Sequence, residues 1–170
     1  EALRAYDQVQ ELRPGDPDSW HRRILMLDRL GRIDEALIAS ERFVAAFPET
    51  MVGWILRGQI LIGTGHPTEA SMAFDHALAI DQKNLEACLG KLTALEMLNS
   101  LDDALTLVDA FIAQQPGVTD LLHRRGTILA RLGRQDEALA AFDATKNQGK
   151  AGYDYSRGLE LLAAGRLEDA

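Results

Sequence analysis

A small residue recurs along this chain at a fixed interval. Alanine is found every 34 residues up to position 138 and once more after a shorter interval of 32 residues. The positions are Ala2, Ala36, Ala70, Ala104, Ala138 and Ala170. A period of roughly 20 to 50 residues is typical of an array in which one small supersecondary unit stacks on its copies. The period therefore predicts a repeat fold.

The residues around these alanines predict two helices per repeat. Five residues before each alanine after Ala2 stands a residue that tolerates positive φ, as helix ends often require: Gly31, Gly65, Asn99, Gly133 and Gly165. Twelve residues after the first four alanines come Pro14, Pro48, Gln82 and Pro116, and proline stops a helix. The expected helices are 1–13, 17–30, 34–46, 50–63, 67–80, 84–98, 101–114, 118–132, 135–146, 151–164 and a start at 167.

Four in-phase copies of one motif resemble the tetratricopeptide repeat. The best-matching segments are Trp54-x2-Arg57-Gly58-x2-Leu61 with Ala70-x3-Phe74, and Leu122-x2-Arg125-Gly126-x2-Leu129 with Ala138-x3-Phe142. The resemblance implies an all-α fold, a right-handed α-solenoid of stacked antiparallel helix hairpins. It covers a single array over 1–170, with a partial repeat 1–16, repeats 17–50, 51–84, 85–118 and 119–150, and a partial repeat 151–170.

Residue size suggests how the hairpins pack. We expect the alanines to lie where the two helices of a hairpin come closest, facing small residues such as Gly58 and Gly126. Ile24 and Leu92 break that rule, and Ser40 and Val108 replace the repeated aromatic residue. The aromatic side chains expected to fill the space between hairpins are Trp20, Trp54, Phe43, Phe74, Phe111 and Phe142.

Composition and charge exclude several classes of function. The net charge of −8 argues against broad binding to nucleic acid or anionic membranes, which needs a dense basic face. The sequence has no apolar run long enough to span a membrane and no visible signal peptide, so we expect a cytoplasmic protein. The single cysteine, Cys88, rules out an internal disulfide and is expected to be buried.

The sequence offers no catalytic, cofactor or metal site. His21, His66, His76 and His123 fall in four different repeats, and none pairs with another at metal-ligand spacing. Phosphate-binding glycine loops and nucleophile motifs are absent from the sequence. We therefore expect a chain that is not an enzyme and binds no cofactor.

Charged residues also follow the period and predict ion pairs between successive helices. A base lies thirteen residues before each alanine, and an acid lies five residues after it. The predicted pairs are Asp7–Arg23, Glu41–Arg57, Asp75–Lys91, Asp109–Arg125 and Asp143–Arg157; the alternative is two independent solvated rows. Exposed pairs are worth roughly 0–1 kcal/mol each.

Three functions fit an array of this kind. The first is a scaffold or adaptor whose concave groove binds a peptide or helix of a partner protein. The second is a self-associating module, and the third is a regulatory or targeting arm of a larger enzyme. The chain begins and stops inside a repeat, so we expect a fragment or an incompletely ordered product. Its ends could stack head to tail on further copies; the alternative is a fraying terminus or a continuation of the chain.

The expected binding groove lies on the first helix of each hairpin, which lines the concave wall in the family that the chain resembles. Helical spacing gives an apolar middle flanked by charge. Apolar anchors of a partner would meet the middle residues, and its carboxylates would meet the arginines. The expected groove residues are Arg22, Arg29, Ile55, Gln59, Ile62, Leu89, Thr93, Met97, His123, Arg124 and Arg131.

Overall fold

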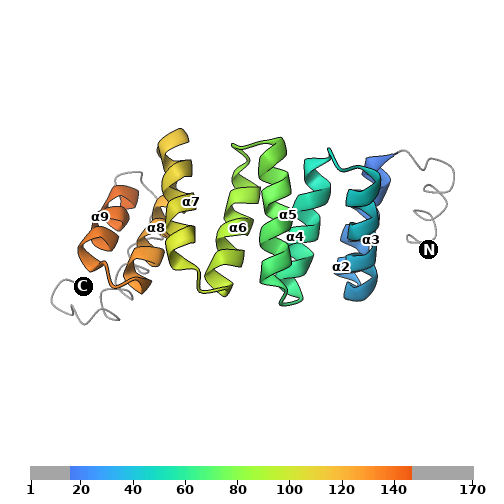
Figure 1. The fold of residues 1–170 in the computed structure, drawn as a ribbon, viewed down its shortest axis with the longest axis horizontal. Helices are drawn as coiled ribbons and strands as arrows, with labels where there is room; N and C mark the ends of the chain where they lie inside the picture. The colour runs from blue at the N-terminus through green and yellow to red at the C-terminus, as the bar shows by residue number, and fades with distance from the viewer. Residues whose placement is uncertain (1–15, 147–170) are drawn as a thin grey trace. The chain divides into compact units, whose positions relative to one another are not determined.

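A computed structural model describes residues 16–146 and consists of helices joined by short turns, with no strand among those residues (Figure 1). The helices are α2 (Pro17–Arg29), α3 (Ile33–Ala46), α4 (Met51–Gly63), α5 (Pro67–Ile80), α6 (Leu85–Met97), α7 (Leu101–Gln114), α8 (Thr119–Arg131) and α9 (Gln135–Lys146). These bounds agree with the expected helices to within one residue at most ends. The expected helices 1–13 and 151–164, and the head-to-tail contact through the two ends, lie outside the described residues.

Local signals mark the starts of α2, α5 and α6. Asp16 caps α2 by accepting a hydrogen bond from the Asp18 backbone N–H at 3.2 Å, and Asn84 caps α6 through the Ala87 N–H at 2.8 Å. Proline occupies the first turn of α2 and α5, where its missing N–H has no intrahelical partner to lose.

The predicted turn residues have the backbone conformation that their chemistry favours. Positive φ is found at Gly31 (68°), Gly65 (76°), Asn99 (55°) and Gly133 (76°), and also at Gly117 (94°). At the end of α2, the Gly31 N–H bonds to the Asp28 carbonyl and the Arg32 N–H bonds to the Leu27 carbonyl, each at 2.9 Å. These bonds satisfy carbonyl groups that the last helical turn would leave without partners.

The chain divides into two compact units, the first ending at Leu98 and the second beginning at Asn99. In unit 1, α2 packs on α3 and α4 packs on α5, and α6 packs on α5. The first helices also touch one another, α2 against α4 and α4 against α6. In unit 2, α8 packs on both α7 and α9. Each unit is therefore a stack of consecutive helices.

Four of the repeated alanines, Ala36, Ala70, Ala104 and Ala138, are buried, but the glycines predicted to face them lie against aromatic rings. A Cβ added to Gly58 in α4 would lie 2.6 Å from Cζ of Phe74, and one added to Gly90 in α6 would lie 2.3 Å from that same atom. In unit 2, a Cβ on Gly126 would lie 2.3 Å from Cε1 of Phe142. The absent side chain thus makes room for a phenyl ring, and the Phe74 ring lies against two helices at once.

The aromatic residues pack within hairpins as well as between them. Phe43, Phe74, Phe111 and Phe142 are buried. Trp20 stacks on Phe43 with ring centroids 6.2 Å apart. These contacts bring α2 and α3 together in unit 1, with Ile24, Leu27, Leu56 and Ile60 in the same apolar cluster.

Two of the predicted ion pairs are confirmed. Lys91 Nζ lies 2.5 Å from Asp75 Oδ1, joining α6 to α5 in unit 1. Arg125 Nε lies 2.6 Å from Asp109 Oδ1, joining α8 to α7 in unit 2. The pairs Asp7–Arg23 and Asp143–Arg157 each include a residue outside the described part of the chain.

The pair predicted between Glu41 and Arg57 does not form, although both residues are described. Arg57 instead lines a pocket beside Trp54 and His76, whose rings stack at a centroid distance of 4.1 Å. Its Nη1 is buried there without a hydrogen-bond partner. This arginine is thus turned toward α5, the second helix of its own hairpin.

Candidate binding surface

The surface that α2, α4 and α6 present in unit 1 is called here the first-helix face. It contains eight of the predicted groove residues. Arg22, Arg29, Gln59 and Met97 are exposed, whereas Ile62, Leu89 and Thr93 are partly buried. The face is therefore accessible at its polar positions and at several apolar ones.

The eighth residue, Ile55, corrects the prediction. Its side chain is 4% exposed and packs with Leu61, Ala70 and Phe74 in the core of unit 1. Ile62 packs against the same cluster and is only partly covered. A partner cannot reach Ile55, because helical spacing alone did not show which edge of the apolar stripe turns inward to α5.

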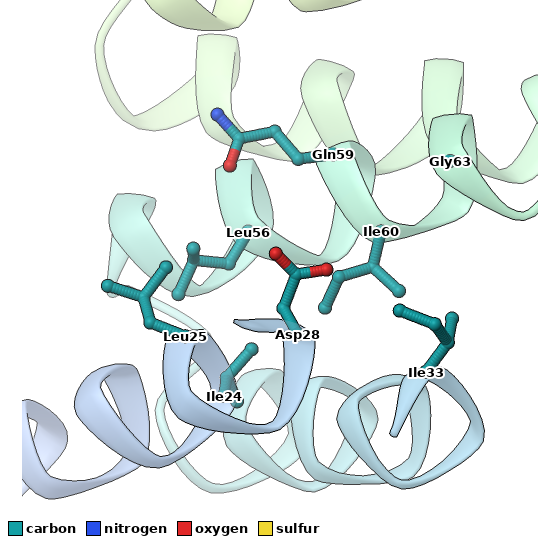
Figure 2. A pocket seen from close by; sticks show the side chains of 8 residues that line it. All are labelled: Ile24, Leu25, Asp28, Ile33, Leu56, Gln59, Ile60 and Gly63. Carbon is teal, nitrogen blue, oxygen red and sulfur yellow. The ribbon is translucent and has the colours of Figure 1, made fainter. Parts of the chain in front are cut away.

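A pocket of about 160 Å³ opens between α2 and α4 on this face (Figure 2). Ile24, Ile33, Leu56 and Ile60 give it apolar walls. Leu25, Asp28, Gln59 and Gly63 complete the lining. The apolar walls and polar rim form a recess for a single side chain, since a cavity of ~150 Å³ holds a benzene molecule.

Three helical positions explain the shape of the pocket. Leu25 and Asp28 project from α2 toward α4, and Gly63 leaves open space at the end of α4 (Figure 2). A Cβ added to Gly63 would meet no atom within 4 Å. Leu25, 36% exposed, occupies the repeat position that holds Gln59 in α4 and Thr93 in α6. That apolar exception is the sequence signal that could have located the pocket.

One hydrogen bond links the rim to the next first helix. Gln59 Nε2 in α4 donates to Glu86 Oε1 in α6 at 2.8 Å. In α6, Thr93 Oγ1 donates to the Leu89 carbonyl at 3.0 Å, which leaves the threonine methyl group and Met97 as neighbouring apolar surface. Met97 is 48% exposed. The first-helix face therefore continues beyond the pocket toward α6.

Comparison with known proteins agrees with this architecture. Two tetratricopeptide repeat models match the chain, one over residues 1–49 and 89–154 and the other over 53–84. The chain belongs to the tetratricopeptide repeat family. No curated protein matches the tetratricopeptide array in sequence.

Solved structures of other tetratricopeptide proteins have the same fold. A repeat protein from Parabacteroides merdae is 21% identical with a TM-score of 0.73, and the match covers 97% of this chain but 65% of that one. MamA is 17% identical with a TM-score of 0.78, and the match covers 92% of this chain and 89% of MamA. YrrB, described as having an unusual peptide-binding site, is 21% identical (TM-score 0.74; 95% and 84% covered). At these identities the likeness shows the fold.

The three predicted groove residues of unit 2 are held by contacts of their own. The His123 ring lies 5.5 Å from that of Phe142, and burial followed by the neighbouring Arg124 charge lowers the pKa of His123. Arg131 Nη2 donates to Asn99 Oδ1 at 3.1 Å. In this part of the array, then, His123 contributes to packing, and Arg131 is tied to a turn at the start of the unit.

Residues 16–146 contain neither a membrane-spanning helix nor a metal-binding cluster. The described helices are all too short or too polar to cross a membrane. No three or more His, Cys, Asp or Glu side chains lie together as metal ligands in that range. Cys88 is buried, as predicted. The tetratricopeptide fold is typically a non-enzymatic interaction module, and the described surface agrees with such a role.

Proposed function

We propose that this tetratricopeptide array is a protein-interaction scaffold that binds a peptide or helix of a partner on the first-helix face of unit 1. An apolar side chain of the partner enters the pocket between α2 and α4. The neighbouring residues of the partner lie across Gln59 and Met97. The pocket is the observation that carries the proposal.

The size and lining of the pocket suit an anchor residue. Its volume of about 160 Å³ is below the ~300 Å³ of the smallest drug-sized ligand sites, so it fits one side chain of a larger partner. Full burial of a leucine or phenylalanine side chain is worth about 1.5–3 kcal/mol. One such anchor therefore supplies a useful part of the affinity of a short peptide.

Exposed apolar residues extend the contact area. Leu25 borders the pocket, and Val52 in α4 and Met97 in α6 are 39% and 48% exposed. Apolar side chains grouped on a surface that otherwise faces water mark interaction sites. Methionine also adapts its shape to different partners, because its side chain is unbranched.

Filling the pocket tests the proposal. Peptides selected from a random library displayed on phage would be measured for binding to the parent chain and to Gly63→Leu. The leucine occupies open space at the pocket wall and replaces a helical glycine, so the variant is expected to fold. We expect it to lose at least tenfold in affinity, which corresponds to about 1.4 kcal/mol.

A matched control places the same side chain elsewhere. Ala79→Leu adds a leucine at an exposed position of α5, outside the pocket, and should leave the affinity unchanged. Failure to select any peptide on the parent chain would contradict the proposal. Equal binding of selected peptides to the parent chain and to Gly63→Leu would place the site elsewhere.

A further inference from the structure

The rim of the pocket consists largely of hydrogen-bond acceptors. Asp28 extends from α2 toward α4, with its carboxylate between Leu56 and Ile60 (Figure 2). Among the described residues, it is the only charged side chain that lines this pocket. Within residues 16–146, no hydrogen bond or ion pair reaches that carboxylate. An ionised carboxylate only accepts hydrogen bonds, and Asp28 is exposed, so it is available to a donor group of a ligand.

The opposite side of the rim has the same character. Gln59 uses one amide N–H to bond Glu86, and its amide oxygen lies on the side of the pocket in Figure 2. Glu86 is exposed, and Gln59 is its one hydrogen-bond partner in the described chain. A ligand that bridges this rim therefore meets two carboxylates and an amide oxygen.

The arginines of α2 flank the pocket without lining it. At 100° per residue, Arg29 projects about 100° from Asp28 around the helix, and Arg22 about 120° from it, both on the side of Leu25. Both are exposed, and neither lines the pocket. Asp28, by contrast, extends toward α4 (Figure 2), so the charge that faces the interior of the pocket is negative.

The position of Asp28 is also unfavourable for its own helix. Asp28 stands in the last turn of α2, one residue before the final Arg29. The carboxyl end of a helix carries partial negative charge, so an acid there is disfavoured unless another interaction offsets it. Within residues 16–146 no cation pairs with Asp28, so a cationic group of a ligand would offset this charge.

We infer that the pocket selects a basic-apolar motif, in which the apolar anchor is accompanied by a lysine or arginine within one turn. The inference rests on the proposed function and adds the chemistry of the partner. The cationic side chain donates to the Asp28 carboxylate while the anchor fills the pocket. The Glu86 oxygen that does not bond to Gln59 accepts a hydrogen bond from a second basic residue of the partner, or from the same residue if its side chain is long enough. A partner rich in acidic residues is disfavoured at this site.

Selections on charge variants test the inference. A random phage-displayed peptide library is selected in parallel on the parent chain, on Asp28→Lys and on Glu49→Lys. Glu49 is an exposed residue in the turn before α4 and does not line the pocket, so both variants change the net charge equally. We expect lysine or arginine beside an apolar residue to be enriched on the parent chain and on Glu49→Lys, and to lose that enrichment on Asp28→Lys.

Affinities of one selected basic peptide complete the test. Asp28→Asn should weaken binding by roughly two- to fivefold, the effect of an exposed charge pair. Glu86→Gln should have an effect of similar size. The thermal unfolding midpoint of Asp28→Asn should stay the same or rise, because an unfavourable charge has been removed from the helix end. Reduced affinity without reduced stability would show that Asp28 acts on the ligand.

The possible failures are distinguishable. Peptides that lack any preference for basic residues, yet are still blocked by Gly63→Leu, would overturn this inference and leave the proposed binding function intact. Equal loss of basic enrichment on Glu49→Lys would mean that the overall charge of −8 attracts the peptides, which would also overturn it. Peptides unaffected by Gly63→Leu would remove both proposals.

Discussion

Three helical glycines of unit 1 lie in different surroundings. A side chain at Gly58 or Gly90 would collide with the Phe74 ring, whereas a side chain at Gly63 would project into open space. Glycine is unfavourable in a helix interior by roughly 0.5–1 kcal/mol relative to alanine. The first two positions offset that penalty by close packing, and the third keeps a pocket open.

Alanine substitutions at these glycines should have opposite effects. Gly63→Ala is expected to raise the free energy of unfolding by at most about 0.5–1 kcal/mol, because it improves helix propensity without a clash at the last residue of α4. Gly90→Ala is expected to lower it by about 1–3 kcal/mol, because its Cβ would lie 2.3 Å from the Phe74 ring. Urea unfolding followed by circular dichroism measures both. A stabilised Gly90→Ala would show that Phe74 can move away freely.

His123 should make the stability of the array depend on pH. Its pKa lies below the ordinary value of 6.5 in the folded chain, first because of burial and then because of Arg124. As the pH falls below 6.5, the unfolded chain therefore binds a proton more readily than the folded chain does, and the free energy of unfolding decreases. Thermal melts between pH 8 and pH 5 should fall more steeply for the parent chain than for His123→Gln. Parallel curves would contradict this assignment.

At the scale of single side chains, sequence reasoning found some features and missed others. The positive-φ turn at Gly31 could be predicted, because few residue types accept that conformation. The burial of Ile55 could not, because an apolar residue at the edge of a helical stripe faces either solvent or the next helix. That choice depends on how closely the neighbouring helices pack.

Whole helices were predicted more accurately than the surface between them. The repeat period gave 67–80 for the helix observed as Pro67–Ile80. Gly65 and Pro67 mark its start in the sequence, and the period alone gives its end, because Gln82 replaces the repeated proline there. The pocket between α2 and α4 could not be predicted, because it depends on the approach of two helices that are not consecutive in the chain. The helix signals are local, and the pocket arises from tertiary packing.

The ion pairs between helices should contribute to stability only slightly. The side chains of Lys91 and Asp75 are 20% and 55% exposed, so water and salt screen their attraction. A double-mutant cycle with Lys91→Met and Asp75→Asn should give a coupling of about 0–1 kcal/mol at low salt. The coupling should shrink in high salt. A larger value that is independent of salt would show that the pair acts through packing.

At the scale of the molecule, a destabilising substitution should lower the stability of nearby helices more than that of distant ones. Repeat proteins are stabilised by contacts between neighbouring units, so a defect weakens nearby helices first. Phe74→Ala is expected to reduce local stability by about 3–5 kcal/mol. Hydrogen exchange measured by mass spectrometry should accelerate most in α4, α5 and α6, and less in α8 and α9. Equal acceleration in every helix would mean that the chain unfolds in one cooperative step.

The ring of Phe74 has a consequence for how such arrays could be recombined. It fits against Gly58 in its own repeat and Gly90 in the next, whereas one repeat earlier the aromatic position holds Ser40 and the position matching Gly90 holds Leu56. At one boundary between repeats, the large residue lies on the second helix of a repeat and the small one on the first helix of the next; at the preceding boundary, the small residue lies on the second helix and the large one on the first. A repeat cut at residue 84 and joined to a new neighbour would separate residues that fit each other. The unit that can be transferred with its packing intact is the second helix of one repeat together with the first helix of the next. Grafts cut at those boundaries should keep their packing.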